Sequence, residues 1–300
     1  MGKIAFIFSG QGAQYSGMGK ELYEASPAAK AVYDMADSVR EGTSRQCFEG
    51  STEELCKTVN TQPCVFTADL AAAYALVEKG IKPDCVAGFS LGEIAALAFS
   101  KMLSDEEAFR LVCKRGELMD KAATENPGAM AAVMKITPQQ VEEICAKFDK
   151  TYPVNYNSPA QTVVATTSEN ADKFCDAVKE AGGRAKLLAV SGAFHSPFMA
   201  KAADGLAEYM KNVDFSEPET VIYSDVTAKP YEGDYKALVK AQVESPVKWQ
   251  TIVENMVADG VDTFIEVGVG KTLTGLVKRI NGDVKAFKVE TPADIEALEL

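Results

Sequence analysis

The hydrophobic residues of this chain are grouped in a way that predicts both strands and helices. Residues 3–9 are apolar with little alternation, which is typical of a central strand in a parallel sheet, where helices cover both faces. Further strands are expected at 84–89, 220–224 and 261–266. Helical patterns separate these segments. This alternation of strands and helices favours an α/β fold with a parallel sheet.

The longest helical pattern covers residues 61–79, with Pro63 expected near its first turn and Gly80 at its end. Ser104 precedes an acidic turn and is expected to cap a helix that ends near Asp120. Arg115 then lies in the last turns of that helix. The other helical patterns cover residues 17–40, 197–211, 234–243 and 249–258.

A turn cluster at Glu125-Asn-Pro-Gly128 marks a change of pattern. The next elements are expected in the order strand, helix, strand, strand, helix, strand, and this is the order of a ferredoxin-like unit. We therefore expect residues 126–193 to form a small subdomain inserted into a larger one made of residues 1–125 and 194–300. The expected elements of the insert cover residues 129–135, 138–148, 152–157, 161–166, 169–181 and 184–189.

Residues 86–97 combine a buried strand, a tight turn and an apolar helix. Gly88 and Gly92 flank Ser90 in the G-x-S-x-G pattern of a nucleophile elbow, where only glycine lacks the Cβ that would clash between the two backbones. The N–H of Leu91 then lies at a helix N-terminus, where partial positive charge stabilises an oxyanion. The alternative is an ordinary strand-to-helix turn with a capping serine. With the elbow, the predicted fold class is α/β, with a hydrolase-like parallel-sheet core and an inserted ferredoxin-like small subdomain.

Two glycine-rich stretches resemble nucleotide-binding loops but lack a required residue. Residues 9–14 (SGQGAQ) fail the dinucleotide pattern because position 15 is Tyr15 instead of glycine. The Gly270-Lys271-Thr272 stretch fails the P-loop pattern because Ile265 stands where glycine is needed. The first stretch is either a flexible loop after a strand or a backbone that approaches a ligand closely.

Composition limits the classes of function. The 300 residues carry a formal net charge of −12, which argues against a nucleic-acid partner. The seven cysteines are scattered, without C-x-x-C or metal-ligating spacing, so we expect a reduced cytoplasmic compartment and no metal. No apolar run is long enough to cross a membrane, and residues 1–9 are expected to form a strand rather than a signal peptide.

The chain contains one histidine, His195, so an imidazole base for Ser90 can only be this residue. It follows Gly-Ala-Phe in a loop at the junction of the two expected subdomains, where sites concentrate. The alternative is a histidine that only packs or is exposed. Arg115 is either a solvated arginine or a bidentate clamp for a carboxylate, which only a planar guanidinium provides.

Seven motifs occur in order along nearly the whole chain, and together they closely resemble the malonyl-CoA:acyl carrier protein transacylases of bacterial fatty-acid synthesis. These motifs are Phe8-Ser-Gly-Gln-Gly-Ala-Gln14, Gly88-Phe-Ser-Leu-Gly-Glu93, Arg115-Gly116, Asn155-Tyr-Asn-Ser-Pro159, Gly192-Ala-Phe-His195, Pro246-Val-Lys-Trp249 and Glu266-Val-Gly-Val-Gly-Lys271. The resemblance implies transfer of a malonyl group from malonyl-CoA to the phosphopantetheine thiol of acyl carrier protein. The reaction that the resemblance implies requires no metal and no bound organic cofactor.

The resemblance also implies roles for individual residues. Ser90 is expected to be the acylated nucleophile and His195 its base, with the backbone N–H groups of Gln11 and Leu91 as the oxyanion hole. The other implied residues bind the substrate: Arg115 holds the malonyl carboxylate, Phe194 disfavours branched acyl groups, and Asn155 and Asn157 lie near the site.

This chain departs from the family beside the nucleophile, where Phe89 stands in place of the usual histidine. It also has Lys248 where many relatives carry glutamine near Trp249. We expect a main-chain carbonyl in that region to orient the histidine, so the Lys248 side chain is given no role. Because the carrier protein is typically acidic, basic patches are candidates for its docking: Lys271, Lys278, Arg279 and Lys285, or Arg184 and Lys186.

Two other functions use the same residues. A serine esterase or thioesterase would have the same elbow, although Arg115 and Phe194 argue against it. A catalytically silent acyltransferase-like module would only bind partners.

Overall fold

The computed structural model describes residues 2–190 and 192–300. Met1 and Ser191, which were expected in the first strand segment and in the loop before His195, lie outside the described residues. The larger sheet has five strands, and every neighbouring pair is parallel. In spatial order they are β7 (Val221–Tyr223), β2 (Cys85–Gly88), β1 (Lys3–Phe8), β8 (Val261–Val267) and β9 (Lys285–Val289).

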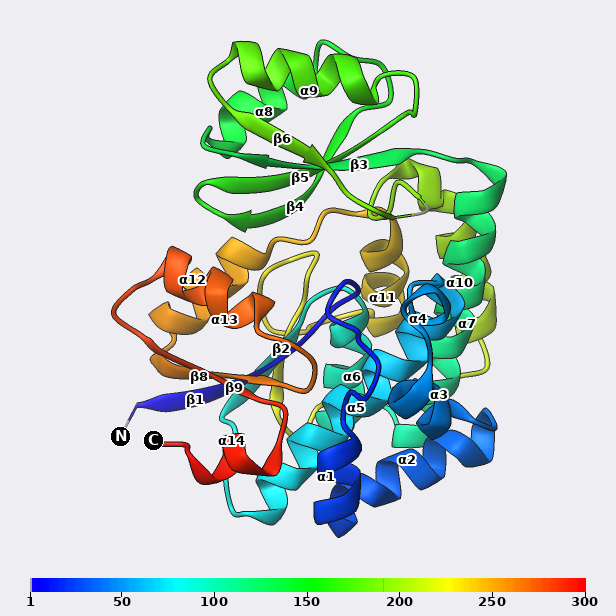
Figure 1. Ribbon diagram of the computed structural model, residues 1–300, viewed down its shortest axis with the longest axis vertical. Coiled ribbons are helices and arrows are strands. Elements are labelled where there is room, and N and C mark those ends of the chain that lie inside the picture. Colours follow the sequence, from blue (N-terminus) through cyan, green and yellow to red (C-terminus); the bar gives the residue numbers. More distant parts are fainter. Residues whose placement is uncertain (1, 191) are drawn as a thin grey trace.

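The second sheet has four strands in the order β4-β5-β3-β6, and all neighbouring pairs are antiparallel. With its two helices it forms the ferredoxin-like unit, which Figure 1 shows above the larger part of the molecule. The predicted fold class is therefore confirmed. The elements are β3 (Ala129–Met134), α8 (Pro138–Cys145), β4 (Tyr152–Ser158), β5 (Gln161–Thr166), α9 (Ala171–Glu180) and β6 (Arg184–Leu187).

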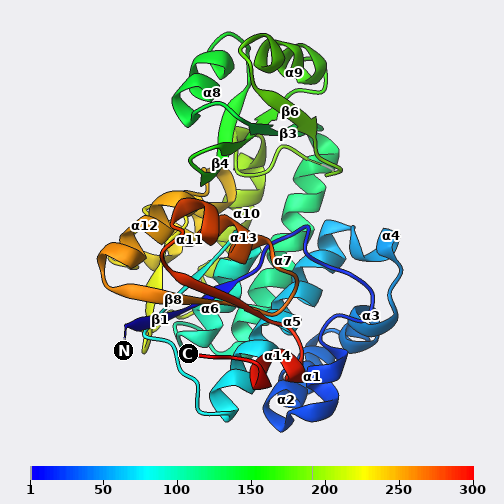
Figure 2. The ribbon, with the colours of Figure 1, turned by 60° about the vertical axis from the view of Figure 1, so that its left-hand side comes forward.

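The remaining helices surround the parallel sheet, and Figure 2 shows them from a second direction. They are α1 (Lys20–Ala25), α2 (Pro27–Val39), α3 (Thr43–Glu49), α4 (Thr52–Leu55), α5 (Thr58–Glu78), α6 (Leu91–Phe99), α7 (Asp105–Glu125), the 3₁₀ turn Pro197–Met199, α10 (Ala200–Met210), α11 (Tyr235–Glu244), α12 (Trp249–Ala258), α13 (Thr272–Ile280) and α14 (Pro292–Glu296).

Alternate residues of β1 supply the two apolar layers of the core, because successive side chains of a strand point to opposite faces. Phe6 and Phe8 join the cluster formed with α5, α6 and α7. Ala5 and Ile7 join a second cluster, formed with α12 and α13. Both faces of the central strand are therefore buried against apolar side chains, which explains its nearly uninterrupted apolar sequence.

Two helices differ from the sequence-based expectation in a way that affects the site. The helix α5 begins at Thr58 rather than residue 61, so Pro63 lies inside it rather than near its first turn. The helix α7 continues to Glu125, beyond the expected end near Asp120. Arg115 consequently lies in the middle of α7, where its side chain is buried instead of fraying with a helix end.

Some elements were not predicted: α3, α4, α13, β9 and α14. All of them except α13 are shorter than 8 residues, the length of α8, so their periodic signal is weak. The predicted helical stretch 17–40 is two helices, since Ser26 caps α2 at Pro27. The strand expected at 184–189 ends at Leu187, and the helix expected at 197–211 begins as a 3₁₀ turn.

Backbone pairing also joins the smaller sheet to a segment of the larger part of the molecule. The N–H of Tyr156 donates to Val247 O (2.9 Å), and the N–H of Val247 donates to Val154 O (2.9 Å). The strand β4 is thus held against the segment that leads into α12. Over residues 2–190 and 192–300, no helix is long and apolar enough to cross a membrane, and no cluster of candidate metal ligands occurs.

Candidate active site

Ser90 lies on a sharp turn between β2 and α6, with φ 57° and ψ −107°. A non-glycine residue in this region of backbone space stores strain of about 1–3 kcal/mol and is usually held there by its surroundings. A Cβ added to Gly88 would lie 2.0 Å from the carbonyl carbon of Gly92, and one added to Gly92 would lie 2.3 Å from Phe8 O. Both flanking glycines are therefore required by close approach of backbones, as the G-x-S-x-G pattern predicted.

We expect Gly88→Ala to lower the free energy of unfolding by at least about 3 kcal/mol, because neither backbone at the elbow can move away from the new methyl group without breaking the sheet. Chemical denaturation measures this loss. Gly275→Ala in α13 is the matched control: nothing lies within 4 Å of its added Cβ, so stability should stay equal or rise. Equal effects of the two substitutions would contradict the close-approach argument.

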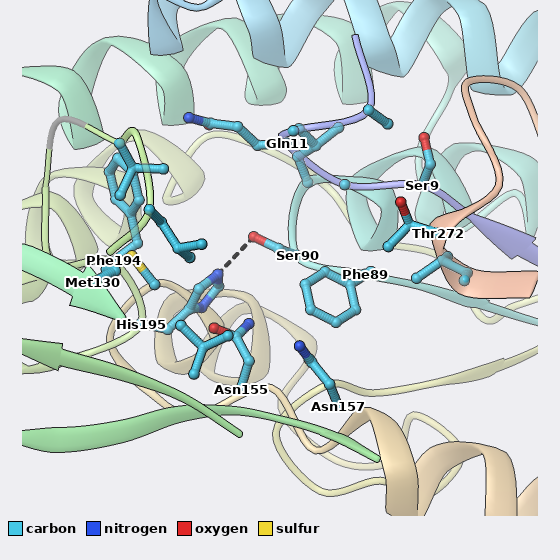
Figure 3. Close-up of a pocket in the computed structure, with 18 of the residues that line it drawn as sticks. Ser9, Gln11, Phe89, Ser90, Met130, Asn155, Asn157, Phe194, His195 and Thr272 are labelled. Carbon is cyan, nitrogen blue, oxygen red and sulfur yellow. Dashed lines mark hydrogen bonds between the residues drawn. The ribbon is translucent and has the colours of Figure 1, made fainter. Parts of the chain in front are cut away.

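His195 reaches the nucleophile from the loop before α10. Its Nε2 lies 2.7 Å from Ser90 Oγ (Figure 3), and its Nδ1 lies 2.9 Å from the backbone carbonyl oxygen of Gln242. Because a carbonyl only accepts, Nδ1 carries the proton and Nε2 is free to accept from the serine hydroxyl. His195 also has a positive φ of 58°, so both members of the pair occupy strained backbone positions.

The residue that orients His195 was expected near Lys248 but is Gln242. The expected kind of group, a main-chain carbonyl, is present, but it lies earlier in the chain than expected: Gln242 is in the last turns of α11, and its carbonyl accepts from the imidazole. The carbonyl is one of the last four of its helix, which have no partner inside the helix. The backbone N–H of Lys248 instead donates to Asp225 O.

The imidazole is neutral at physiological pH. Burial, with the nearby Arg115 cation as a second cause, lowers the pKa of His195 to about 3. The carbonyl acceptors at Gln242 and Ser245 oppose that shift only in part. A neutral imidazole beside a serine hydroxyl is the state that can remove a proton.

Arg115 approaches the same hydroxyl from α7. Its Nη2 donates to Ser90 Oγ (3.2 Å) and to Gln242 Oε1 (2.8 Å), and its Nη1 donates to Gln62 Oε1 (2.9 Å). The side chain is 1% exposed, and its Nε has no acceptor. Burial lowers the pKa of Arg115 to about 10, so the group remains a cation at neutral pH. Within the described chain this cation has no ion pair, and it is therefore available to an anion.

Two backbone N–H groups face the same region. That of Leu91 opens α6, and that of Gln11 lies in the loop after β1, the strand next to β2. Among the residues that the structure describes, neither donates to a protein acceptor. Free donors at a helix N-terminus and an adjacent loop are suited to an oxyanion.

These groups open into a cavity of about 290 Å³ between the two sheets. Figure 3 shows Asn155 and Asn157 of β4 on one side of it and Gln11 on the other. Within the described part of the chain, the buried Asn157 Oδ1 has no hydrogen-bond partner. The cavity brings together every site residue predicted from the sequence: Gln11, Ser90, Leu91, Arg115, Asn155, Asn157, Phe194 and His195.

Phe89, where the chain departs from the family, lines the same cavity beside Ser90 (Figure 3). Its ring packs against Trp249, with centroids 5.6 Å apart at 62°. Among the described residues, the buried Trp249 Nε1 has no hydrogen-bond partner. The departure therefore changes the lining of the cavity, and the Ser90–His195 contact is present beside it.

Four buried polar residues of the site were not predicted. Gln62 and Gln242 hold Arg115, while Glu93 and Asp225 lie behind Ser90. Gln62 and Gln242 each interrupt an apolar helix face, and that interruption was the available signal. Glu93 and Asp225 occur at positions where acidic residues commonly cap helices or form turns, so no sequence pattern distinguished them as site residues.

A serine on an elbow, a neutral histidine that accepts from its hydroxyl and an available cation within reach of the same oxygen define a serine-dependent acyl-transfer enzyme on an α/β scaffold. The comparisons with known proteins agree. Residues 5–291 match the acyl transferase domain family. A malonyl CoA-acyl carrier protein transacylase from Bacillus subtilis (strain 168) is 40% identical over 304 residues, covering 99% of this chain and 96% of that protein.

Solved structures give the same result. The malonyl CoA-acyl carrier protein transacylase from Clostridium perfringens superimposes with a TM-score of 0.94 at 36% identity, covering 98% of this chain and 95% of that one. A malonyl-transacylase in complex with a holo type II PKS acyl-carrier protein also has a TM-score of 0.94, at 34% identity and 98% coverage of both chains. This chain belongs to the malonyl CoA-acyl carrier protein transacylases.

Proposed function

We propose that this protein transfers a malonyl group from malonyl-CoA to the phosphopantetheine thiol of acyl carrier protein through a malonyl-Ser90 ester, and so supplies fatty-acid synthesis. The position of Arg115 carries the proposal. Its buried guanidinium, with only neutral acceptors, lies beside the hydroxyl that would form the ester. A malonyl group has a thioester carbonyl at one end and a carboxylate at the other, which matches this pair of groups.

In the first half-reaction, Ser90 Oγ attacks the thioester carbonyl carbon while His195 Nε2 takes the hydroxyl proton. The carbonyl oxygen becomes an oxyanion that the N–H groups of Gln11 and Leu91 hold, each contributing on the order of 3 kcal/mol. The carbon–sulfur bond then breaks, and the imidazolium returns its proton to the sulfur of coenzyme A. The Gln242 carbonyl stabilises the imidazolium through Nδ1–H.

In the second half-reaction, the carrier thiol gives its proton to His195 Nε2 and attacks the malonyl-Ser90 ester. The carbon–oxygen bond breaks, and Ser90 Oγ recovers the proton. The enzyme returns to its starting state after two acyl transfers, which is a ping-pong sequence. No redox change occurs, and the proposal includes no metal or organic cofactor.

The substrate carboxylate is expected to strengthen the base. Arg115 is one of the causes that lower the pKa of His195. A carboxylate paired with Arg115 offsets that cation, so the pKa of His195 rises when a malonyl group is bound. The base is then stronger with a carboxylated acyl group than with an acetyl group.

The remaining predicted residues complete the proposal. Phe194 is buried in the cavity wall and limits the space for branched acyl groups, while Asn155 and Asn157 provide amides for polar parts of the substrate. For the carrier protein we propose docking at α13, because Thr272, Leu273 and Leu276 line the cavity and basic residues lie on the same element and near it. These basic residues are Lys271, Lys278, Arg279 and Lys285, all exposed. The cytoplasmic location stays a prediction.

We also propose the division into a large subdomain, residues 1–125 and 194–300, and an inserted small subdomain, residues 126–193. The end of α7 at Glu125 and the separate hydrogen bonding of the two sheets support these limits.

Intact-mass spectrometry after incubation with malonyl-CoA tests the function. We expect a malonyl adduct that is absent in Ser90→Ala and that disappears when holo acyl carrier protein is added, with the malonyl group recovered on the carrier. Rapid release of free malonate without a malonylated carrier would identify a thioesterase. Absence of any adduct in the wild-type protein would favour a silent module.

A further inference from the structure

Two buried carboxyl groups lie directly behind the nucleophile and take no part in the reaction described above. Glu93 is in the first turn of α6 and Asp225 follows β7; the two side chains are 1% and 0% exposed. Asp225 Oδ2 accepts from the backbone N–H of Ser90 (2.8 Å) and from Gln242 Nε2 (3.2 Å). Glu93 Oε1 accepts from the Tyr231 hydroxyl (2.6 Å) and from the N–H of Asp225 (3.2 Å).

The other oxygen of each carboxyl, Asp225 Oδ1 and Glu93 Oε2, is buried without a donor in the described residues. The two residues are neighbours, since the N–H of Asp225 donates to Glu93 Oε1, and a proton on one of the two carboxyl groups would supply the donor that these oxygens lack. Burial first, and the neighbouring Glu93 second, raise the pKa of Asp225 well above its usual value. Burial likewise raises the pKa of Glu93. One proton between the two groups satisfies both oxygens, whereas two ionised carboxylates would repel each other.

We propose that Asp225 and Glu93 share one proton at neutral pH, and that Asp225 in this protonated pair is a positioning residue that fixes the amide of Gln242 and, through it, Arg115. The proposal of a shared proton does not depend on the proposed malonyl transfer. The proposed effect on Arg115 does depend on that transfer.

The Gln242 amide connects the pair to the site. Its Nε2 donates to Ser90 O (2.6 Å) and to Asp225 Oδ2, and its Oε1 accepts from Arg115 Nη2. If the amide were turned over, its NH₂ group would face the Arg115 donor and its oxygen would face two acceptors. Asp225 therefore favours the one orientation in which Gln242 offers an acceptor to Arg115.

The charges of the buried cluster balance only with the shared proton. Arg115 is the nearby cation, His195 is neutral, and the hydroxyl of Tyr231 stays protonated because burial and Glu93 raise its pKa. One proton on the pair leaves one negative charge opposite Arg115. Loss of that proton would bury a second negative charge with no further cation.

The sign of the pH effect follows from the raised pKa values. Between about pH 4, where an unfolded Asp ionises, and the higher pKa of the folded pair, the native protein holds one proton more than the unfolded chain. Stability is therefore lost as pH rises through that window. The folding constant falls about tenfold per pH unit relative to a protein that lacks the shared proton.

Asp225→Asn tests the proton directly, because asparagine has the shape of the protonated carboxyl: its Oδ1 can accept from Ser90 and Gln242, and its Nδ2 can donate to Glu93. Chemical denaturation at increasing pH from about pH 5 should show the wild-type folding constant falling by about tenfold per unit relative to this variant, until the folded pair loses its proton. Glu93→Gln should remove the same dependence. Asp84→Asn is the matched control, since Asp84 also accepts a backbone N–H, from Ile4 (2.8 Å), but is exposed; it should follow the wild type.

Positioning is tested with the neutral reagent phenylmethanesulfonyl fluoride, which labels a reactive serine without using malonyl-CoA. Asp225→Ala should slow Ser90 labelling, and lower the preference for malonyl-CoA over acetyl-CoA, by at least about tenfold each, because two buried donors lose their acceptor. Asp225→Asn should restore both to within about threefold. Parallel stability curves for wild type and Asp225→Asn would overturn the shared proton, and equal losses in both variants would overturn the positioning role. A failure of malonyl transfer alone would leave the stability and labelling results intact.

Discussion

Replacing His195 with alanine is expected to slow the formation of the malonyl-Ser90 adduct by about 10⁵-fold, since loss of the base in serine enzymes with a comparable pair removes nearly all of the rate of acylation. His195 is the only histidine of the chain, so no other imidazole can substitute for it. Rapid-quench mass spectrometry with malonyl-CoA measures the rate. Added imidazole should restore part of it by entering the space that the side chain leaves.

The lowered pKa of His195 predicts how the acylation rate depends on pH in acid. With the pKa of His195 at about 3, the free enzyme keeps a neutral base down to about pH 4, and the acylation rate should not decrease near pH 6.5 as it would for an exposed histidine. A tenfold or smaller loss in His195→Ala would contradict the role as base. A decrease centred at pH 6.5 would show instead that the imidazole is solvated in the reacting enzyme.

Replacing Arg115 with alanine is expected to lower kcat/KM for malonyl-CoA by at least about 10²-fold, because the variant would leave a buried substrate carboxylate without a partner. The value for acetyl-CoA, which has no carboxylate, should change by less than about tenfold. Steady-state transfer assays with both thioesters give the comparison.

Arg110→Ala is the matched control for this experiment. Arg110 lies on the same helix, pairs with Glu106 at 2.8 Å and is half exposed, so its loss should leave both substrates unaffected. Equal losses for malonyl-CoA and acetyl-CoA in Arg115→Ala would contradict the carboxylate clamp. They would point instead to a role of the guanidinium in holding Ser90 and Gln242.

The parts of the fold that depend on neighbouring residues in the chain could be predicted from the sequence. The apolar segment 3–9 identified a central strand, and the β-α-β-β-α-β order identified the small subdomain. The elements that were not predicted are short, such as α4 and β9, and their position is decided by packing rather than by periodicity. The start of α5 was predicted too late because Pro63 was expected in the first turn. A proline inside a helix is unfavourable unless the surrounding core stabilises the helix.

By itself, the sequence determined the elbow, because Gly88, Ser90 and Gly92 form it within five residues. It also limited the choice of an imidazole base to one residue, because there is one histidine. The tertiary structure alone decided which groups meet around Ser90. Gln242 is 152 positions away along the chain and Asp225 is 135 positions away, yet both contact this residue. Contacts at such separation depend on how helices and loops pack over the sheet, and local patterns of polarity do not predict that packing. The proposed nucleophile and base could be predicted from the sequence, while the buried polar network around them follows from packing.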